Sequence, residues 1–380
     1  MRVNPALDRA GAHPITAIQE QVRDLRARGE EVLDFSLGDP VEPTWEEVRS
    51  TVATSIPPVS QYPTTRGLPD LRRAIAGYLR RRFGVEVDPD TQIIPTSGAK
   101  EAIFSSHLAF VDRDRGDAVG YPDPGYPVYA RGAGLAGAEP RPIPAGDDFV
   151  IAAGQVRPAD WERMAMLWIC TPSNPTGAVT SLTQLQGLVE AARTHETLLC
   201  SDECYVDLYE DDPPASVLQA AGPDSEGVLS FLSLSKRSGM TGYRSGAIVG
   251  DRAAIERIFR LRTSTGTASP EFVQSGAAVA WNDDEHVAAR RETFAEKRRI
   301  LRSGLEAAGV EVFASSAGLY LWVKVADDLG VATDLAAAGV VVSPGSIFGT
   351  RGTGFLRLAL VPDAATCLRA VELMAPILAG

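Results

Sequence analysis

The sequence predicts an α/β fold, with a mostly parallel central sheet in a large domain and a smaller α+β domain after it. Short apolar runs alternate with amphipathic stretches through the middle of the chain. Several of these runs end in polar residues, and parallel sheets bind ligands at the carboxyl ends of their strands. After about Trp281, a long arginine-rich stretch and alternating apolar segments indicate the smaller domain.

In the first half of the chain, a helix is expected over Pro14–Arg28 and an extended segment over Val32–Leu37. This N-terminal part is too short to fold alone, so we expect it to pack on the smaller domain. The run Thr91–Pro95 predicts a strand that leads into a helix from about Ser97 to Phe110.

The second half continues the alternation. Met166–Cys170 predicts a strand, and a helix should begin near Ser181 because Ser181 and Gln184 have the spacing of a capping box. A long helix is expected over Glu285–Ala307. Further strands are expected at Leu198–Asp202, Val228–Leu232, Leu319–Val325 and Phe355–Leu360. The predicted units are an N-terminal segment over 1–45, a large domain over 46–280 and a small domain over 281–380.

The composition excludes several classes of protein. The 380 residues are 44% hydrophobic and 23% charged, which argues against a disordered chain, a collagen-like repeat and a coiled coil. A net charge of −12 argues against a nucleic-acid partner. No apolar run approaches the ~20 residues of a membrane-spanning helix, and the charged N-terminus lacks the apolar stretch of a signal peptide. We therefore expect a cytoplasmic protein with no membrane partner.

The cysteines do not indicate a metal site. Cys170, Cys200, Cys204 and Cys367 contain no C-x-x-C pair, and no cysteine or histidine spacing matches a zinc site. We expect buried free thiols and no bound metal.

Two motif matches need separate explanations. Gly132–Gly137 matches the dinucleotide fingerprint G-x-G-x-x-G, but no strand precedes it and Glu139–Pro142 cannot open a regular helix after it. We interpret it as a small-residue packing segment. Ser233–Lys236 matches S-x-x-K, the acylation motif of some serine enzymes, although the S-D-N and K-T-G partners of that motif are missing. A serine acyl-transfer enzyme is therefore an alternative from a different class.

Any lysine chemistry must come from four residues, because the other basic residues are arginines. Lys236 follows the strand Val228–Leu232 in a Ser/Gly-rich turn, where it would project at the ligand-binding edge of the sheet. Lys297 lies in the charged helix, Lys324 ends a strand of the small domain, and Lys100 lies in the first turn after Ser97. Lys236 is thus the best candidate.

Eight segments in the same order resemble those of the class I/II aminotransferases of fold type I, which use pyridoxal 5'-phosphate. The segments are Asp34–Pro40, Gln61–Gly67, Thr96–Glu101, Tyr121–Tyr126, Pro172–Gly177, Ser201–Tyr205, Ser233–Lys236 with Arg244, and Phe355–Arg357. The resemblance implies an aspartate aminotransferase-like fold, a homodimer with a shared active site, and substrates that are an amino acid and a 2-oxo acid.

The resemblance also implies cofactor-binding roles. Lys236 would carry the cofactor and then move the substrate α-proton, and Asp202 would face the protonated pyridine nitrogen. Asn174 and Tyr205 resemble the pair that hydrogen-bonds the ring oxygen, and Tyr126 the aromatic stacked on the ring. A helix N-terminus, a hydroxyl and cations would hold the phosphate: Gly98, Ala99, Lys100, Ser233, Arg244 and, from the partner subunit, Tyr62.

For the substrate, Arg357 resembles the arginine that holds the α-carboxylate bidentately, assisted by the Gly38 backbone and Asn174. Three further stretches resemble the succinyldiaminopimelate transaminases: Val59–Pro63, Arg82–Val85 and Ala268–Gln274. This predicts N-succinyl-LL-2,6-diaminopimelate as donor and 2-oxoglutarate as acceptor. A long acidic tail needs a second cation, for which Arg66 and Arg262 are candidates. A general aspartate or alanine aminotransferase, a C–S lyase and a decarboxylase of the same fold are the alternatives.

Overall fold

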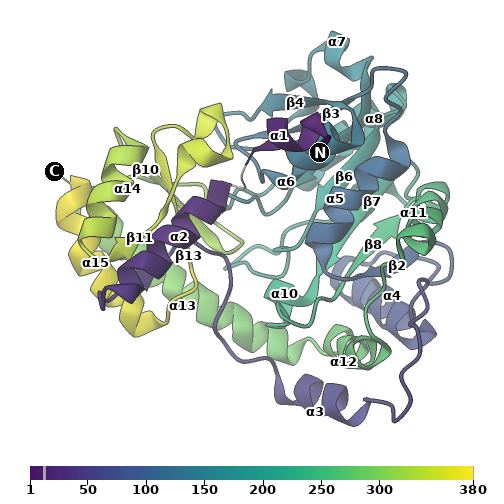
Figure 1. Cartoon of the computed structure of the whole chain (residues 1–380), viewed down its shortest axis with the longest axis horizontal. Helices are drawn as coiled ribbons and strands as arrows, with labels where there is room; N and C mark the ends of the chain where they lie inside the picture. The colour runs from purple at the N-terminus through teal and green to yellow at the C-terminus, as the bar shows by residue number, and fades with distance from the viewer. Residues whose placement is uncertain (12–13, 380) are drawn as a thin grey trace.

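The computed structural model describes residues 1–11 and 14–379, and its largest feature is a seven-stranded sheet with the order β2-β8-β7-β6-β5-β3-β4 (Figure 1). Strands β3 to β7 run parallel, whereas β8 runs antiparallel to both of its neighbours. The strands are β2 (Ile93–Thr96), β3 (Ala118–Asp123), β4 (Glu139–Pro144), β5 (Met164–Cys170), β6 (Leu198–Asp202), β7 (Val228–Ser233) and β8 (Gly246–Gly250). The expected mostly parallel sheet is confirmed.

Helices cover both faces of this sheet, which explains why its inner strands are apolar almost throughout. Along β5, Met166 and Trp168 point into the core on one face, and Leu167 and Ile169 into the core on the other. The first face carries α5 (Ala99–Phe110), α6 (Val128–Ala136) and α11 (Arg252–Thr265). The second carries α4 (Pro69–Phe83), α8 (Leu182–Thr194), α9 (Val217–Ala221) and α12 (Glu271–Asn282).

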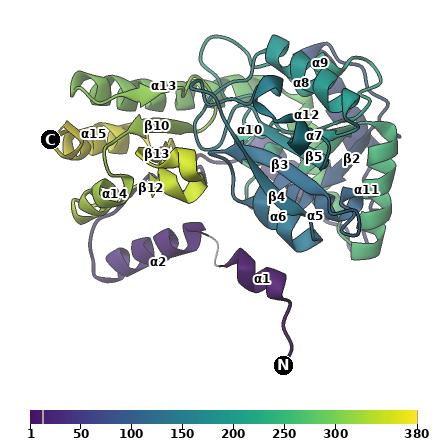
Figure 2. The same ribbon diagram turned by 90° about the horizontal axis from the view of Figure 1, so that it is seen from above.

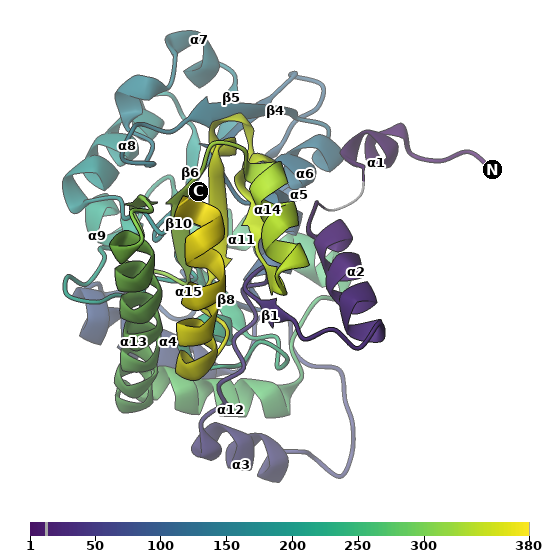
Figure 3. The ribbon, with the colours of Figure 1, turned by 90° about the vertical axis from the view of Figure 1, so that its left-hand side faces the viewer.

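A second, four-stranded antiparallel sheet of order β12-β13-β10-β9 lies beside the large sheet and its helices and has a hydrophobic core of its own. Its strands are β9 (Val312–Phe313), β10 (Tyr320–Lys324), β12 (Ser343–Pro344) and β13 (Phe355–Ala359). Leu301 and Leu305 of the long helix α13 (Glu285–Ala307) and Met374 of α15 (Ala364–Ala379) pack on it. Figure 3 shows α13 and α15 side by side, with α14 (Asp328–Ala337) next to them.

The N-terminal helices lie along one side of the molecule, α2 beside the part that contains the four-stranded sheet and α1 beside the part that contains the seven-stranded sheet (Figure 2). Helix α2 (Pro14–Ala27) packs Ile18 and Val22 against Val341, and β1 (Leu33–Asp34) pairs with β11 (Val340–Val341). These two elements therefore contact the C-terminal part of the chain, whereas the short helix α1 (Pro5–Ala10) lies against α6. The domain boundaries at 45/46 and 280/281 stay predictions.

The structure resolves the status of several motifs. The Gly132–Gly137 segment is the second half of α6 and its C-cap, and a Cβ at Gly132 would collide with the ring of His107, so it is a packing segment as expected. The capping box of Ser181 and Gln184 is formed. Among the residues that the structure describes, no helix has both the length and the apolar character to cross a membrane.

Candidate active site

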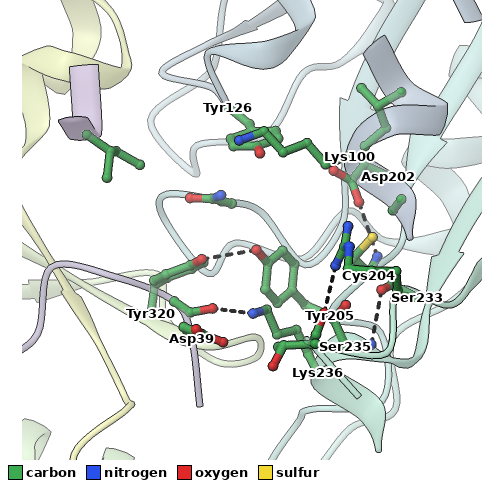
Figure 4. A pocket seen from close by; sticks show the side chains of 18 of the residues that line it. Asp39, Lys100, Tyr126, Asp202, Cys204, Tyr205, Ser233, Ser235, Lys236 and Tyr320 are labelled. Atoms are coloured by element: carbon green, nitrogen blue, oxygen red, sulfur yellow. Dashed lines mark hydrogen bonds between the residues drawn. The ribbon is translucent and has the colours of Figure 1, made fainter. Parts of the chain in front are cut away.

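Most of the site residues expected from sequence line one cavity of about 540 Å³, at the carboxyl ends of β5, β6 and β7 and facing β10 and β13 (Figure 4). Those that line it are Gly38, Ala99, Lys100, Tyr126, Asn174, Asp202, Tyr205, Ser233, Lys236, Arg244 and Arg357. Gly98 lies directly behind this wall, against the Arg244 guanidinium. The cavity therefore collects residues from positions 38 to 357 of the chain at the edge where a parallel sheet binds ligands.

Lys236 lies in α10 (Leu234–Arg237), the single turn that follows β7. Its amine points across the cavity and donates to the carbonyl of Gly38. Burial lowers the pKa of Lys236 to about 8, and the nearby carboxylate of Asp39 acts in the opposite direction. An amine with such a pKa is partly unprotonated near neutral pH and can act as a nucleophile or a base.

Asp202 ends β6 and is almost fully buried at the base of the cavity. Its carboxylate accepts a hydrogen bond from the hydroxyl of Tyr129 at 2.8 Å and one from the backbone amide of Cys204 at 3.2 Å. Burial raises the pKa of Asp202, because both of these partners are neutral and compensate only part of the lost hydration. A cation placed against this carboxylate would therefore be strongly favoured.

The start of α5 forms one end of the cavity. Gly98 caps this 12-residue helix with a φ of 82°, and a Cβ there would collide with the guanidinium of Arg244. The side chains of Lys100 and Ser233 line the same cavity. Burial and the charge of Arg244 lower the pKa of Lys100. Unpaired amides of a helix N-terminus together with an arginine, a lysine and a hydroxyl are the chemistry that binds a phosphate group.

Arg357, on β13, is fully buried although it carries a charge. Its Nη1 donates to the Asn174 side-chain oxygen at 2.9 Å, and its Nη2 donates to the carbonyl of Ser36. Its guanidinium carbon lies 4.4 Å from the ring centre of Tyr320 and 4.5 Å from that of Phe348. A planar cation held in this way is suited to bidentate binding of a carboxylate.

Sequence reasoning missed Tyr320, whose hydroxyl lies 3.0 Å from that of Tyr205. The missing information was strand pairing: Trp322 pairs with Arg357, so Tyr320, two residues earlier, shares a face with Arg357. Cys204 was expected to be a buried thiol, but it is only half-buried and lines the cavity because it follows Asp202 in the chain. Ile15 is a further wall residue that no motif indicated, and Asp39 is a wall residue that lies in the family-like segment Asp34–Pro40 but was given no role.

Two expected substrate contacts are not in this cavity. Arg262 is buried and holds the carboxylate of Glu101 at 2.9 and 3.0 Å, so its role as a second cation for a substrate tail is wrong. Arg66 pairs with Glu256 at 3.1 Å and lies over the ring of Phe259, outside the cavity wall. Tyr62 is fully exposed and does not reach this cavity in its own chain.

Comparison with known proteins shows to which family the chain is similar. The sequence model of the aminotransferase class I and II family matches residues 30–373. An LL-diaminopimelate aminotransferase of Dehalococcoides mccartyi is 35% identical over 374 residues, which are 96% of each chain. The 4-dedimethylamino-4-oxo-anhydrotetracycline transaminase OxyQ of Streptomyces rimosus is 36% identical, over 93% of this chain and 92% of its own. A probable N-succinyldiaminopimelate aminotransferase structure from Thermus thermophilus superimposes with a TM-score of 0.90 at 27% identity, over 96% of this chain and all of the other.

Proposed function

The chain belongs to the class I and II aminotransferases, and we propose that it transfers the amino group of a diaminopimelate compound to 2-oxoglutarate. Enzymes of this family depend on pyridoxal phosphate and act on small amino and 2-oxo acids. The serine acyl-transfer alternative is therefore wrong. The Ser233 hydroxyl instead accepts a hydrogen bond from the backbone amide of Ser235 at 3.1 Å and caps α10.

The residues of the cavity fit pyridoxal phosphate. The buried carboxylate of Asp202 has only neutral partners, and a protonated pyridine nitrogen would supply the missing cation. Lys236 offers the amine that holds the cofactor covalently. The helix N-terminus at Gly98 and Ala99 would hold the phosphate together with Lys100, Ser233 and Arg244. When bound, the cofactor supplies an electron sink that stabilises negative charge at the substrate α-carbon.

The other groups of the cavity bind and orient. Lys236, once its amine is free, would take the α-proton and return it, for which a pKa of about 8 is well suited. Tyr205 and Asn174 would hydrogen-bond the ring oxygen, and Tyr126 would cover the ring. Arg357 would hold the α-carboxylate, with Asn174 and the Gly38 backbone beside it.

The similarity over 96% of both chains to an LL-diaminopimelate aminotransferase carries the choice of donor. Two forms of this donor are candidates. The three stretches that resemble succinyldiaminopimelate transaminases and the Thermus thermophilus structure favour the N-succinyl form. The D. mccartyi relative favours the free LL form.

We expect a diaminopimelate form to be the best donor when N-succinyl-LL-diaminopimelate, LL-diaminopimelate, aspartate and alanine are compared in kcat/KM with 2-oxoglutarate as the acceptor. The margin should be at least tenfold, or about 1.4 kcal/mol of transition-state binding. Half-reaction spectra should show a stable aminated cofactor, whereas release of pyruvate, ammonia and a thiol from a thioether amino acid such as cystathionine would indicate a C–S lyase. If aspartate or alanine exceeds both diaminopimelates by tenfold, the chain is a general aminotransferase instead.

A homodimer with a shared active site belongs to the same proposal. The loop between α3 (Glu46–Thr54) and α4 exposes Ile56, Val59 and Tyr62, an apolar stretch that a second copy of the chain would cover. Tyr62 would then reach the phosphate site of the partner subunit.

Mixing a Tyr62→Phe variant with a Lys236→Ala variant should restore activity, because each hybrid dimer would contain one site with both wild-type residues. For equal amounts and random pairing we expect roughly a quarter of wild-type activity, in excess of what the Tyr62→Phe protein gives alone. A Tyr209→Phe variant, altered outside the cavity, is the matched control. When it is mixed with the Lys236→Ala variant, the activity should not exceed what the Tyr209→Phe protein contributes alone. A fully active monomer in sedimentation experiments would contradict the shared site.

A further inference from the structure

Tyr320 touches two groups of the proposed catalytic machinery at once. Its hydroxyl lies 3.0 Å from the hydroxyl of Tyr205, and Figure 4 shows the two phenols pointing at each other across the cavity wall. Its ring lies under the guanidinium of Arg357, 4.4 Å from the guanidinium carbon. Tyr320 itself is almost completely buried at the start of β10.

The backbone around Tyr320 leaves little freedom for its hydroxyl. A Cβ at Gly38 would collide with Tyr320 Oη, so only a glycine at position 38 allows the phenol to lie where it does. The carbonyl of the same Gly38 accepts the hydrogen bond from Lys236. The Tyr320 hydroxyl is therefore fixed between Tyr205 and the segment that the lysine contacts.

The charge of Arg357 favours one direction of the hydrogen bond between the two phenols, in which either oxygen could be the donor. A guanidinium cation over the Tyr320 ring makes that phenol more acidic, and it lowers the pKa of Tyr320 against the larger effect of burial. With Tyr320 as the donor and Tyr205 Oη as the acceptor, Tyr205 would direct its own proton into the cavity.

We propose that Tyr320 is a positioning residue: its hydroxyl orients the proton of Tyr205 toward the cofactor ring oxygen, and its ring supports Arg357 where the substrate carboxylate binds. The proposal rests on the proposed assignment of Tyr205 and Arg357, and it adds a direct connection between the cofactor-binding and substrate-binding halves of the cavity. The roles of the hydroxyl and of the ring can be tested separately, because Tyr320→Phe removes only the hydroxyl, whereas Tyr320→Leu also removes the ring.

The first test is the pH titration of the visible absorption of the holoenzyme, in the absence of any amino donor. A hydrogen bond into the cavity stabilises the anionic ring oxygen, which is the high-pH form, so Tyr320→Phe should raise the titration midpoint by roughly 0.5 pH unit. The same substitution in a Tyr205→Phe background should give no further shift, and Tyr209→Phe should leave the midpoint unchanged. A wild-type midpoint in Tyr320→Phe, or an equal shift without Tyr205, would overturn the proposal.

The second test is the dissociation constant of a dicarboxylate such as succinate. Tyr320→Phe should change it less than about twofold, whereas Tyr320→Leu should weaken binding at least ~fivefold because the stacked ring is lost. Equal affinities in the two variants would overturn the support given to Arg357. Neither measurement uses an amino donor, so failure of the diaminopimelate assignment would leave this result unaffected.

Discussion

Replacing Lys236 with alanine should reduce kcat by at least ~10⁴-fold, the upper end of what a positioned proton-transfer group contributes alone. The variant loses both the amine that holds the cofactor and the base that moves the α-proton. The purified wild-type protein should be yellow, and the variant should bind the cofactor only noncovalently. Borohydride treatment of the wild type followed by peptide mapping should locate the modification at Lys236.

Lys324→Ala is the matched control, because this exposed lysine pairs with Glu311, lies over the ring of Phe313 and does not line the cavity. It should keep wild-type activity and colour. A modified lysine at position 100, 297 or 324 in the peptide map would show the assignment to be wrong.

The pKa of about 8 adds a pH dependence to this prediction. A lowered amine pKa means that the reactive neutral form is about 10% of the total at pH 7 and about 90% at pH 9. The rate at which the apoprotein combines with pyridoxal phosphate should therefore rise over this interval and level off above it. An amine with an unperturbed pKa would continue to gain rate beyond pH 10.

The parts of the fold that depend on local pattern could be predicted from the sequence. The helix Glu285–Ala307 and the strand Leu198–Asp202 have the bounds expected, because amphipathic periodicity and a continuous apolar run are local signals. In the large sheet, the strands β3, β4 and β8 were missed. The sequence EPRPIP of β4 contains three exposed prolines that only an edge position tolerates, and the glycine-rich β8 gains its stability from pairing with β2 and β7.

The residues of the candidate site also fall into those that a local motif predicts and those that only tertiary contacts bring to the cavity. Lys236, Asp202 and Arg357 each lie at a strand or in the turn after one, and family-like motifs surround them, so they could be named before any coordinates. Tyr320 and Ile15 have no such motif, and Asp39, although it lies in the family-like segment Asp34–Pro40, was given no role. They reach the cavity through strand pairing and through the packing of the N-terminal segment, which are tertiary contacts that no local pattern specifies. The prediction for Arg262 failed for the same reason, since this residue pairs with Glu101 of another helix.

Replacing Asp202 with asparagine should lower kcat by ~10²–10³-fold, the range for removing one preorganised electrostatic partner. Asparagine has nearly the same shape and can still accept the 2.8 Å hydrogen bond from Tyr129, so the substitution removes mainly the charge. Without that charge, the protonated form of the cofactor's pyridine nitrogen would no longer be stabilised, and the cofactor would be a weaker electron sink.

Tyr129→Phe provides the matched comparison, because it keeps the Asp202 charge and removes only the hydroxyl donor. We expect it to cost less than about tenfold in kcat, the scale of one hydrogen bond. The stability of the apoprotein should separate function from folding. Burial raises the pKa of Asp202, so at pH 7 its ionised form is a cost to the empty protein, and Asp202→Asn should leave the apoprotein Tm unchanged or higher. If Asp202→Asn keeps kcat within tenfold of wild type, or if Tyr129→Phe loses as much, then the charge of Asp202 is not what the reaction uses.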